Sequence, residues 1–519
     1  MSPRKTSAEA ARRAEQRAKQ AQAQYGTTAT LPASFTPEEV FAALNDNETG
    51  DARLLTAAMK DRFVFDAKRR LFFRFEGGYW KKDLENESLA FAGRVLRETY
   101  GKEAARQYAI ATDPREDEET KKTALYRQSL FNRRLDRVNS LHRMESTLKL
   151  AATGLQGLII SGDEWNADPW SIQAQNRIID LKTGESRPGL PSDFINKAAP
   201  TEWKGLPDDE PAVAWCMFMN SIFNGNRPLI DYVQRVLGAA LVGKPSQQEF
   251  YIFWGEGRNG KGTILETLKE VLGEALASPI RSELIMDARQ AGNNGPNPEL
   301  LDLQGKRIVW ASETRDGQRL NAEKVKLFTG GDTLSSRYNY SNEMISFKPS
   351  HTLFMLTNNK PRISAGDTAV WDRLRLVPFL MRFVDNPTAD NERRKDIDLQ
   401  EKLLKEASGI LAWLVQGCLD WQRDGLNPPP VVTESGQEYR LDEDPVQQFV
   451  NERCLVGPGY RAQAKPLHDD FSNWFTETYG SKASVPSLKR FSDRLRRNFN
   501  REEGRNVWFH GLALIGDEQ

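Results

Sequence analysis

A glycine-rich loop between a strand and an amphipathic helix is the feature that most constrains this fold. The largely apolar run 249–254 is suited to a buried strand, and it leads directly into the loop 255–263, Gly-Glu-Gly-Arg-Asn-Gly-Lys-Gly-Thr. The helix predicted next carries its apolar residues on one face, namely Ile264, Leu265, Leu268, Val271 and Leu272. In this setting, backbone N–H groups can bind phosphate at the positive end of a helix. The pattern predicts the P-loop of an NTPase, with a structural glycine turn as the alternative.

The loop also predicts which residues bind ATP and Mg²⁺. Lys261 is expected to reach the β- and γ-phosphate oxygens. The Ser or Thr that usually follows this lysine is replaced by Gly262, and Thr263 comes one place later. The magnesium ion is therefore held either by Thr263 through an adjusted turn or largely by water. The predicted nucleotide-binding residues are Gly255, Gly257, Asn259, Gly260, Lys261, Gly262 and Thr263.

Two later apolar strands are predicted to end in catalytic side chains. The first, 306–312, is followed by Glu313, which is the candidate base for the attacking water and a second metal ligand. Ser312 stands where an aspartate often lies. The second, 352–356, is followed by Thr357 and Asn358, and the Asn358 amide can hydrogen-bond the γ-phosphate or the attacking water. The alternative for Asn358 is a plain Asn-rich turn.

An arginine that precedes a further apolar segment completes the predicted catalytic set. Arg373 lies in the stretch 371–376, Trp-Asp-Arg-Leu-Arg-Leu. An arginine at this place could stabilise the transition state on the nucleotide of a neighbouring subunit. A surface salt bridge is the alternative interpretation.

The order of predicted elements divides the chain. Helices and apolar strands alternate from the Pro-rich stretch 200–211 to Gly425, which predicts an α/β domain with a mainly parallel sheet. Upstream, we expect strands at 63–75 and 79–80, then helices with a charged loop at 113–119, then a strand and turn at 176–184. The expected domains are a basic tail (1–34), an α+β N-terminal region (35–200), the ATPase (205–425) and a C-terminal module (432–519).

The C-terminal module has the pattern of a winged helix. Helices are predicted at 467–479 and 488–499, with Ser487 capping the second, and a hairpin is predicted at 501–514. A basic helix beside a hairpin can lie against DNA. A solvated charged face or a protein-docking surface is the alternative. The DNA-binding residues predicted here are Lys489, Arg490, Arg494 and Arg497.

Composition limits the other possibilities. The chain has 519 residues, with three cysteines and four histidines that lie far apart, so we expect no zinc site. Lys plus Arg equals Asp plus Glu, 72 against 72, so any DNA contacts must be local. The sequence has no apolar run of membrane-spanning length and no signal peptide, so we expect a cytoplasmic protein without membrane contact.

The order of motifs resembles the superfamily 3 helicases, and within them the phage and plasmid primase-helicase family with poxvirus-type motors. The resemblance begins near residue 60 and includes the N-terminal helicase-associated region around Trp80 and 176–184. It implies an AAA+ type P-loop core, a hexameric ring, ATP with magnesium, and movement along one DNA strand, typically 3′ to 5′. In this family the segment 324–349 carries a hairpin that grips single-stranded DNA in the pore. The corresponding DNA contacts here are Lys324, Lys326, Arg337, Tyr338 and Lys348.

The predicted function is therefore an ATP-dependent, ring-forming DNA helicase that replicates a phage, satellite or plasmid in the bacterial cytoplasm. The sequence before residue 60 is too short for the primase that the family often carries, so a separate primase or polymerase is the expected partner. The winged helix would bind duplex or forked DNA. The alternatives are an origin-binding initiator whose ATPase drives ring assembly, and an ATP-independent winged-helix regulator with a decayed P-loop.

Overall fold

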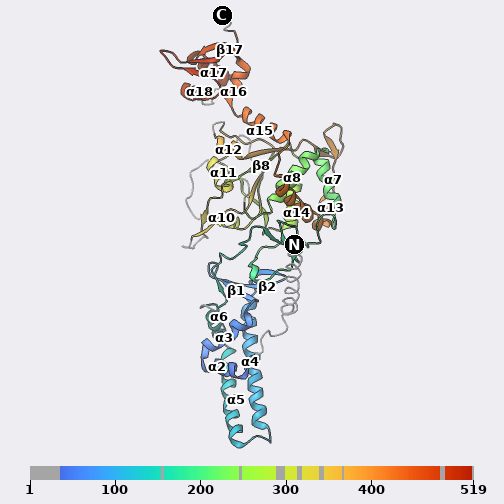
Figure 1. Cartoon of the computed structure of the whole chain (residues 1–519), viewed down its shortest axis with the longest axis vertical. Coiled ribbons are helices and arrows are strands. Elements are labelled where there is room, and N and C mark those ends of the chain that lie inside the picture. The colour runs from blue at the N-terminus through green and yellow to red at the C-terminus, as the bar shows by residue number, and fades with distance from the viewer. Residues whose placement is uncertain are drawn as a thin grey trace, which may run out of the picture.

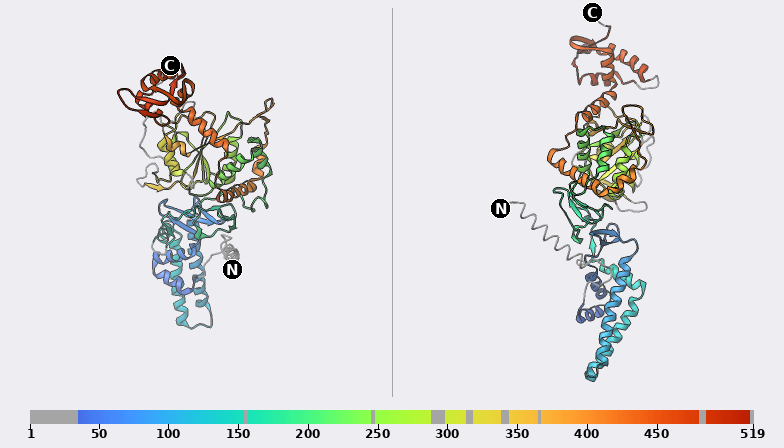
Figure 2. Two further views of the ribbon diagram at one scale, coloured as in Figure 1. Left: turned by 45° about the horizontal axis from the view of Figure 1, so that its top comes forward. Right: turned by 90° about the vertical axis from the view of Figure 1, so that its right-hand side faces the viewer.

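The structure is a computed structural model that describes residues 35–153, 157–244, 248–287, 298–312, 318–337, 344–364, 367–479 and 485–516. The molecule is elongated. N-terminal helices lie at one end, a five-stranded sheet lies in the middle, and a small C-terminal unit lies at the other end (Figures 1 and 2). Across these ranges no helix has the length and apolar character needed to cross a membrane. The predicted basic tail, 1–34, lies outside the described residues.

The N-terminal helices pack around an apolar core of their own, which includes Leu55, Leu96 and Phe131. A fully buried ion pair joins α3 to α5, because Arg134 Nη1 lies 2.8 Å from Asp51 Oδ1. The charged loop predicted at 113–119 separates α4 from α5, and these two helices extend to the lower end of the molecule in Figure 1. The helices are α2 (Pro37–Asn45), α3 (Asn47–Met59), α4 (Glu87–Thr112), α5 (Glu118–Val138) and α6 (Leu141–Ala151).

Two small sheets lie between these helices and the middle of the molecule. The predicted turn at Gly77 and Gly78 is confirmed, and both glycines have a positive φ that other residues rarely adopt. The strand and turn predicted at 176–184 are also confirmed. One sheet has the order β3-β2-β1-β4, formed by β1 (Phe63–Asp66), β2 (Leu71–Glu76), β3 (Tyr79–Lys82) and β4 (Ile159–Ile160). The other contains β5 (Ser171–Gln173), β6 (Ile178–Asp180) and β7 (Ser186–Arg187).

The middle of the molecule is an α/β unit built on a parallel sheet, as the alternating pattern predicted. All strand pairs in this sheet are parallel, and the order is β14-β8-β13-β10-β9. Parallel strands of this kind are covered on both faces and are apolar along their length. The strands are β8 (Phe250–Trp254), β9 (Ala277–Ile280), β10 (Ile308–Ser312), β13 (Thr352–Thr357) and β14 (Leu374–Pro378).

Alternate side chains of β8 enter two different cores. Tyr251 and Phe253 lie in one core with α7, α8, α9 and α14, whereas Phe250 and Ile252 lie in the other with α11, α12 and α15. Helices therefore cover both faces of the sheet. The helices of this unit are α7 (Val213–Ile222), α8 (Arg227–Ala239), α9 (Lys261–Leu272), α10 (Pro298–Asp302), α11 (Ala322–Thr329), α12 (Thr368–Arg373), α13 (Leu399–Lys405), α14 (Ala407–Asp424) and α15 (Pro430–Asp442).

Segments on either side of this unit share its cores. Ile179 and Trp203, from the region upstream, lie in the same core as Phe253, and Tyr439 of α15 lies in the core that contains Phe250. Two short strand pairs complete the unit: β11 (Leu334–Ser336) with β12 (Ile345–Phe347), antiparallel, and β15 (Arg382–Val384) with β16 (Glu392–Arg394), parallel.

The C-terminal unit has the element order helix, strand, helix, helix, strand, strand, with the sheet order β17-β19-β18. Ser487 caps α18, as predicted, and the hairpin predicted at 501–514 is present. The second helix was predicted to reach Phe499 but ends at Leu495, because the chain turns there to begin β18. The elements are α16 (Pro445–Arg453), β17 (Cys454–Gln463), α17 (Ala464–Tyr479), α18 (Leu488–Leu495), β18 (Asn500–Glu502) and β19 (Trp508–Leu514).

Candidate nucleotide site

The carboxyl ends of β8 and β13 bring the glycine-rich loop next to Asn358. The two strands are neighbours in the sheet, and Trp254 is paired with Thr357 at their last position. The loop starts directly after Trp254, and Gly255 N–H donates to the carbonyl oxygen of Thr357 at 3.3 Å. Ligands of open α/β sheets bind at this edge of the sheet.

Two glycines are required by the space around the loop. A Cβ on Gly260 would lie 2.7 Å from Cγ2 of Ile222, and a Cβ on Gly255 would lie 2.2 Å from the carbonyl oxygen of Phe379. Gly260 also has a φ of 87° directly before α9, which begins at Lys261. Since side chains are excluded here, the backbone of the loop is free to approach a ligand closely.

Lys261 is buried, and its ammonium group contacts only neutral oxygens. Its Nζ donates to the carbonyl oxygen of Gly255 at 2.5 Å and to Oδ1 of Asn358 at 3.1 Å. Burial lowers the pKa of Lys261 to about 8. A buried ammonium group without a carboxylate partner favours an anionic ligand. These residues therefore fit a phosphate group, and with it a magnesium ion held by phosphate oxygens, water and few protein ligands.

The side chain of Asn259 holds the loop rather than facing outward. Asn259 is buried, and its Nδ2 donates to the carbonyl oxygen of Phe379 at 3.2 Å. The sequence placed Asn259 among the nucleotide-binding residues. The geometry leaves its backbone N–H for that role, because the amide group of its side chain is engaged in tying the loop to the end of β14.

Of the two predicted metal ligands, Thr263 lies among the described residues and Glu313 does not. Thr263 is half-buried in the first turn of α9, next to the exposed Gly262. Ser312 ends β10 and is paired with Leu356, so β10 leads to the same edge of the sheet as β13. Glu313, the predicted base, follows it but lies outside the described residues. No group of three or more His, Cys, Asp or Glu side chains that could hold a metal ion occurs among the described residues.

Arg373 lies at the amino ends of the strands, whereas the glycine-rich loop lies at their carboxyl ends. This arginine ends α12 and directly precedes β14, whose first residue, Leu374, is paired with Phe250 at the start of β8. The glycine-rich loop follows the other end of β8, five residues further along the strand. At about 3.3 Å per residue, this separation is roughly 16 Å. Arg373 is therefore too far away to reach a phosphate bound at the loop of its own chain.

Two arginines at these amino ends have different partners, which sequence reasoning did not foresee. Arg373 donates from Nη1 to the carbonyl oxygen of Ala369 at 2.8 Å and from Nη2 to Oε1 of Gln248 at 2.6 Å. Arg375 instead forms an ion pair with Glu249, 2.8 Å from Nη2 to Oε1. The charge of Arg375 is thus neutralised inside the subunit, whereas the hydrogen-bond partners of Arg373 are neutral.

Two lysines expected to contact DNA are held by the protein. Lys324 Nζ donates to the carbonyl oxygens of Glu283 at 2.9 Å and Met286 at 3.0 Å. Lys326 Nζ lies 3.0 Å from Oδ1 of Asp367. Both sit on α11, which packs against the sheet, so their side chains are directed to neighbouring segments. These contacts within the chain give both lysines structural roles, and the DNA contacts expected of them stay predictions.

The remaining residues of the expected pore segment surround a short hairpin. β11 and β12 are antiparallel, Arg337 directly follows β11, and Lys348 is exposed directly after β12. Tyr338 lies outside the described residues. A hairpin is therefore present in the segment where the resemblance implied one.

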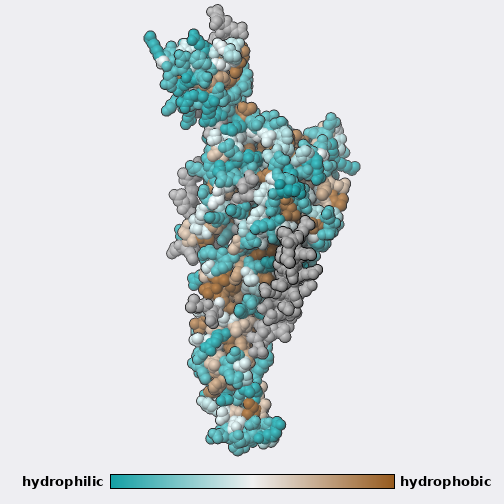
Figure 3. Space-filling view, in the orientation of Figure 1, coloured by the Kyte–Doolittle hydropathy of each residue, from teal (hydrophilic) through white to brown (hydrophobic). Residues whose placement is uncertain are grey.

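The basic helix of the C-terminal unit has one arginine with a structural role. Arg494 Nε donates to Oδ2 of the buried Asp444 at 2.7 Å, and Asp444 caps the first helix of the unit. Binding of DNA by Arg494 stays a prediction, in addition to this structural contact. The other three predicted residues, Lys489, Arg490 and Arg497, are exposed. The visible surface of this unit is mainly hydrophilic in Figure 3.

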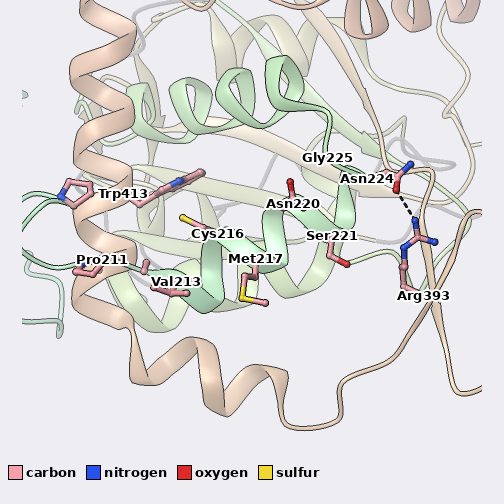
Figure 4. Close-up of a pocket in the computed structure, with 13 residues that line it drawn as sticks. Pro211, Val213, Cys216, Met217, Asn220, Ser221, Asn224, Gly225, Arg393 and Trp413 are labelled. Carbon is pink, nitrogen blue, oxygen red and sulfur yellow. Dashed lines mark hydrogen bonds between the residues drawn. The ribbon is translucent and has the colours of Figure 1, made fainter.

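A cavity of about 850 Å³ lies beside α7 but does not include the glycine-rich loop. Figure 4 shows Cys216, Met217 and Asn220 of α7 on its wall, with Trp413 of α14 nearby and Arg393 bound to Asn224. Another face of α7 packs against Gly260. The cavity and the loop thus lie on different sides of this helix, and the cavity is not the phosphate site.

Comparison with known proteins adds the family. Residues 52–224 match the family described as "D5 N terminal like". The chain is 28% identical over 323 residues to "Putative helicase L207/L206" of Acanthamoeba polyphaga mimivirus, covering 60% of this chain and 33% of that protein. These matches support a D5-like primase-helicase family for the chain. The matched residues, 52–224, overlap most of the N-terminal region predicted at 35–200.

Other relatives of the chain carry similar names. It is 23% identical over 399 residues to "Putative helicase 121R" of Invertebrate iridescent virus 3, covering 72% of this chain and 42% of that protein. It is 24% identical over 224 residues to "Putative primase C962R" of African swine fever virus, isolate Tick/Malawi/Lil 20-1/1983, covering 41% and 23%. The chain thus spans less than half the length of each of these relatives.

Among solved structures, the chain was compared with the apo C-terminal region of NrS-1. The TM-score is 0.43 at 13% sequence identity, and the alignment covers 90% of this chain and 86% of the other. The relatives named above come from large DNA viruses, and they place the chain with replication-related helicases and primases.

Proposed function

We propose that this chain is an ATP-driven, ring-forming DNA helicase of superfamily 3, with an AAA+ type P-loop core. The observation that carries the proposal is the meeting of Lys261 with Asn358 at the carboxyl edge of a parallel sheet. A lysine at the start of a helix and an amide on the neighbouring strand are the two groups needed to bind a γ-phosphate and sense its cleavage. The similarity of the chain to the D5-like family and to viral helicases supports the same conclusion.

In this proposal the loop residues bind the phosphates of ATP. The backbone N–H groups from Gly257 to Gly262 approach the β-phosphate, and Lys261 exchanges its two neutral oxygen partners for phosphate oxygens. Glu313 orients the attacking water and accepts its proton. Thr263 holds Mg²⁺ directly or through water, and the ion supplies positive charge beside the β- and γ-phosphates. The motor cannot work as a monomer if Arg373 acts, as we propose, on the site of the next subunit.

The position of Arg373 supports assembly into a ring. Arg373 lies at the amino ends of the strands, away from the loop of its own chain. The hydrogen bonds of its guanidinium group go only to neutral oxygens. A neighbouring subunit that brings its glycine-rich loop to these amino ends would supply the anionic partner that Arg373 lacks. A closed ring of such contacts gives every site one arginine. We propose a hexamer, as the resemblance implies.

The C-terminal unit is proposed to be a winged helix that binds duplex or forked DNA. Its element order and its sheet order support this proposal, in which α18 is the helix placed against DNA and β18–β19 is the wing. We place its beginning at Asp444, because α15 packs on the motor. Lys489, Arg490 and Arg497 are the proposed contacts, and Arg337, Tyr338 and Lys348 are those of the pore.

Strand displacement distinguishes the proposed helicase from the alternative origin-binding initiator. Purified protein with ATP, Mg²⁺ and a labelled fork should release the displaced strand, and the Lys261→Ala protein should not. An initiator would bind duplex DNA and assemble on it with ATP, yet leave the fork intact. Release of the strand without hydrolysis of ATP would contradict both.

The proposal extends to the biological setting predicted from sequence. The motor would replicate a phage, satellite or plasmid in the bacterial cytoplasm, with a separate primase or polymerase as its partner. The relatives named here are viral, which supports a replicon-encoded motor and leaves the host to experiment. Copurification of a primase or polymerase from the natural host would test the partner.

A further inference from the structure

Basic side chains from distant parts of the sequence meet where the N-terminal sheet approaches the motor. Lys197 Nζ donates to the carbonyl oxygen of Ala275 at 3.1 Å, and Lys306 Nζ donates to that of Glu274 at 2.7 Å. Both carbonyl groups follow the C-terminal end of α9. The junction cluster consists of Lys197, after β7, and of three cations whose charges act on it: Arg69 in the β1–β2 turn, Lys82 at the end of β3 and Lys306 before β10.

The N-terminal part of the cluster reaches the same loop of the motor. Arg69 Nη2 donates to Oε1 of Gln304 at 3.0 Å. Lys197 packs against Gly305 so closely that a Cβ added to this glycine would lie 3.0 Å from Cε of the lysine. Residues 304–306 therefore touch side chains from both the β1–β2 turn and the segment after β7. In this way three regions of the chain present positive charge at one place.

The positive charge of the cluster is only partly neutralised. Arg69 lies 2.6 Å from the buried carboxylate of Asp66, and Lys306 is close to Asp302 and Glu274. Burial lowers the pKa of Lys197 to about 7, and the charged groups that add to this effect are all cations: Lys306, Arg69, Lys82 and Arg307. An anion placed among these cations would reduce their mutual repulsion and favour the charged form of Lys197.

We propose that the junction cluster binds the phosphate backbone of DNA where the strand passes between the N-terminal sheet and the motor. This inference rests on the DNA motor proposed above and adds a contact that the motifs do not indicate. A row of cations along a path, rather than a closed pocket, is the arrangement that follows a nucleic acid backbone.

Two observations favour a DNA backbone over a free phosphate ion. The small cavity lined by Lys197, Gly305 and Arg307 has a volume of about 10 Å³, which is room for one water molecule but not for phosphate. The backbone of Lys306 is also hydrogen-bonded to the segment that follows the proposed pore hairpin. Ser350 Oγ donates to the carbonyl oxygen of Lys306 at 2.8 Å, and the exposed Lys348 lies two residues before Ser350, after β12.

The chain offers a matched pair of lysines for the test. Lys82 is exposed and belongs to the cluster, whereas Lys81, on the opposite side of the same strand, is paired with Glu76 at 3.0 Å. Full-length Lys82→Gln and Lys81→Gln proteins would be titrated with fluorescent oligo(dT) and with a labelled fork at several salt concentrations. Equal melting temperatures of the two variants would verify that both are folded.

The expected result is a loss of DNA affinity of about threefold to tenfold for Lys82→Gln, with a fall of about 0.7 to 0.9 in the slope of log K against log salt. Lys81→Gln should bind like the wild type. Unchanged binding by Lys82→Gln, or an equal loss in both variants, would overturn the proposal. Displacement of DNA by millimolar inorganic phosphate, at matched ionic strength, would indicate a closed phosphate site and would overturn it as well.

A pH titration gives a second, independent readout. DNA favours the charged form of Lys197, so binding should take up a proton, and affinity should fall between pH 7 and pH 8.5. The charged groups that act on this lysine are Arg69, Lys82, Lys306 and Arg307, and carboxylates act in turn on two of these: Glu274 and Asp302 on Lys306, and Asp168 on Arg307. The same titration of the Lys197→Gln protein shows how much of the pH dependence comes from Lys197. Equal pH dependence in the wild type and in Lys197→Gln would contradict the role of this lysine.

Failure of this inference can be told apart from failure of the proposed function. Wild-type protein that binds no DNA under any condition would remove the DNA motor itself. Wild-type protein that binds and unwinds DNA, together with a Lys82→Gln protein that does both equally well, would remove only the junction cluster.

Discussion

The ammonium group of Lys261 lies 3.1 Å from the amide oxygen of Asn358, although 97 positions separate the two residues in the sequence. The contact follows from the sheet order, because β8 and β13 are parallel neighbours, the glycine-rich loop after β8 leads to Lys261, and Asn358 directly follows β13. The second partner of Lys261 is the carbonyl oxygen of Gly255. Both partners are neutral, so a bound triphosphate would be the first anion to meet this lysine.

We expect Lys261→Ala to abolish ATP hydrolysis, with a loss on the order of 100-fold or more, because the charge at the phosphates is removed. Lys269→Ala is the matched control, since Lys269 lies at the other end of the same helix and pairs with the exposed Glu274. Phosphate release measured for both variants checks the prediction. Substantial turnover by Lys261→Ala would remove the site.

Arg373→Ala should leave ATP binding and ring assembly intact while hydrolysis falls by about 100-fold or more, as expected of an arginine acting between subunits. Mixing Arg373→Ala with Lys261→Ala subunits should restore part of the hydrolysis. In a mixed ring some sites combine an intact Lys261 with an intact Arg373 from the neighbour. Mixed rings as inactive as the separate variants, or an active monomer, would contradict this arrangement.

Binding of ATP should weaken as the pH rises from 7 to 9. Burial lowers the pKa of Lys261 to about 8 in the free protein, and phosphate oxygens favour its charged form, so binding takes up a proton above that pKa. The expected loss by pH 9 is roughly tenfold in affinity, since about a tenth of the lysine is then charged. A Lys261→Arg protein keeps its charge and should show no such fall; equal pH profiles for the two proteins would count against the assignment.

Acid should destabilise the motor through His351. This side chain is buried, both ring nitrogens lack a hydrogen-bond partner among the described residues, and burial lowers its pKa to about 4. The unfolded chain binds the proton first, so stability is lost as the pH falls from about 6.5 to 4, by up to about 3 kcal/mol. His351→Phe should flatten this part of the unfolding curve measured by denaturant at several pH values, whereas the exposed His142→Gln should not.

Two arginines of α18 should behave differently. Arg490→Ala should weaken binding of duplex DNA for all sequences alike and lower the salt slope by about 1, because Arg490 is exposed and is proposed to contact phosphate. Arg494→Ala should lower the free energy of unfolding of the C-terminal unit by on the order of 3 kcal/mol, because the buried Asp444 loses its partner. DNA anisotropy and thermal unfolding separate the two outcomes; a stable Arg494→Ala unit would show that the ion pair is dispensable.

Much of the architecture could be predicted from local patterns. The parallel sheet follows from apolar runs that alternate with amphipathic helices, and the hairpin at Gly77 and Gly78 follows from residues that favour positive φ. The end of α18 was predicted four residues too late. The apolar spacing continued to Phe499, and only the pairing of β18 with β19 ended the helix at Leu495.

Individual roles in the site were less predictable than the motif. Lys324, Lys326 and Arg494 look like available cations in the sequence, yet each has a partner supplied by a segment at least 38 residues away. Arg373 is bound to Gln248 and Arg375 to Glu249, and neither partner belongs to a recognisable sequence motif. Such partners depend on how the elements pack together. The sequence around a charged residue does not indicate which distant oxygen atom will be its partner.

The sequence by itself determined the glycine-rich loop, the strand before it and the helix after it, because these are fixed by residues that are neighbours along the chain. Only the tertiary structure decided that Asn358 meets Lys261, that Arg373 lies at the amino ends of the strands, and that Lys82 and Lys197 gather near Lys306. The physical reason is that sheet order and the docking of one unit on another depend on the sum of many long-range contacts, none of which is written in a local pattern.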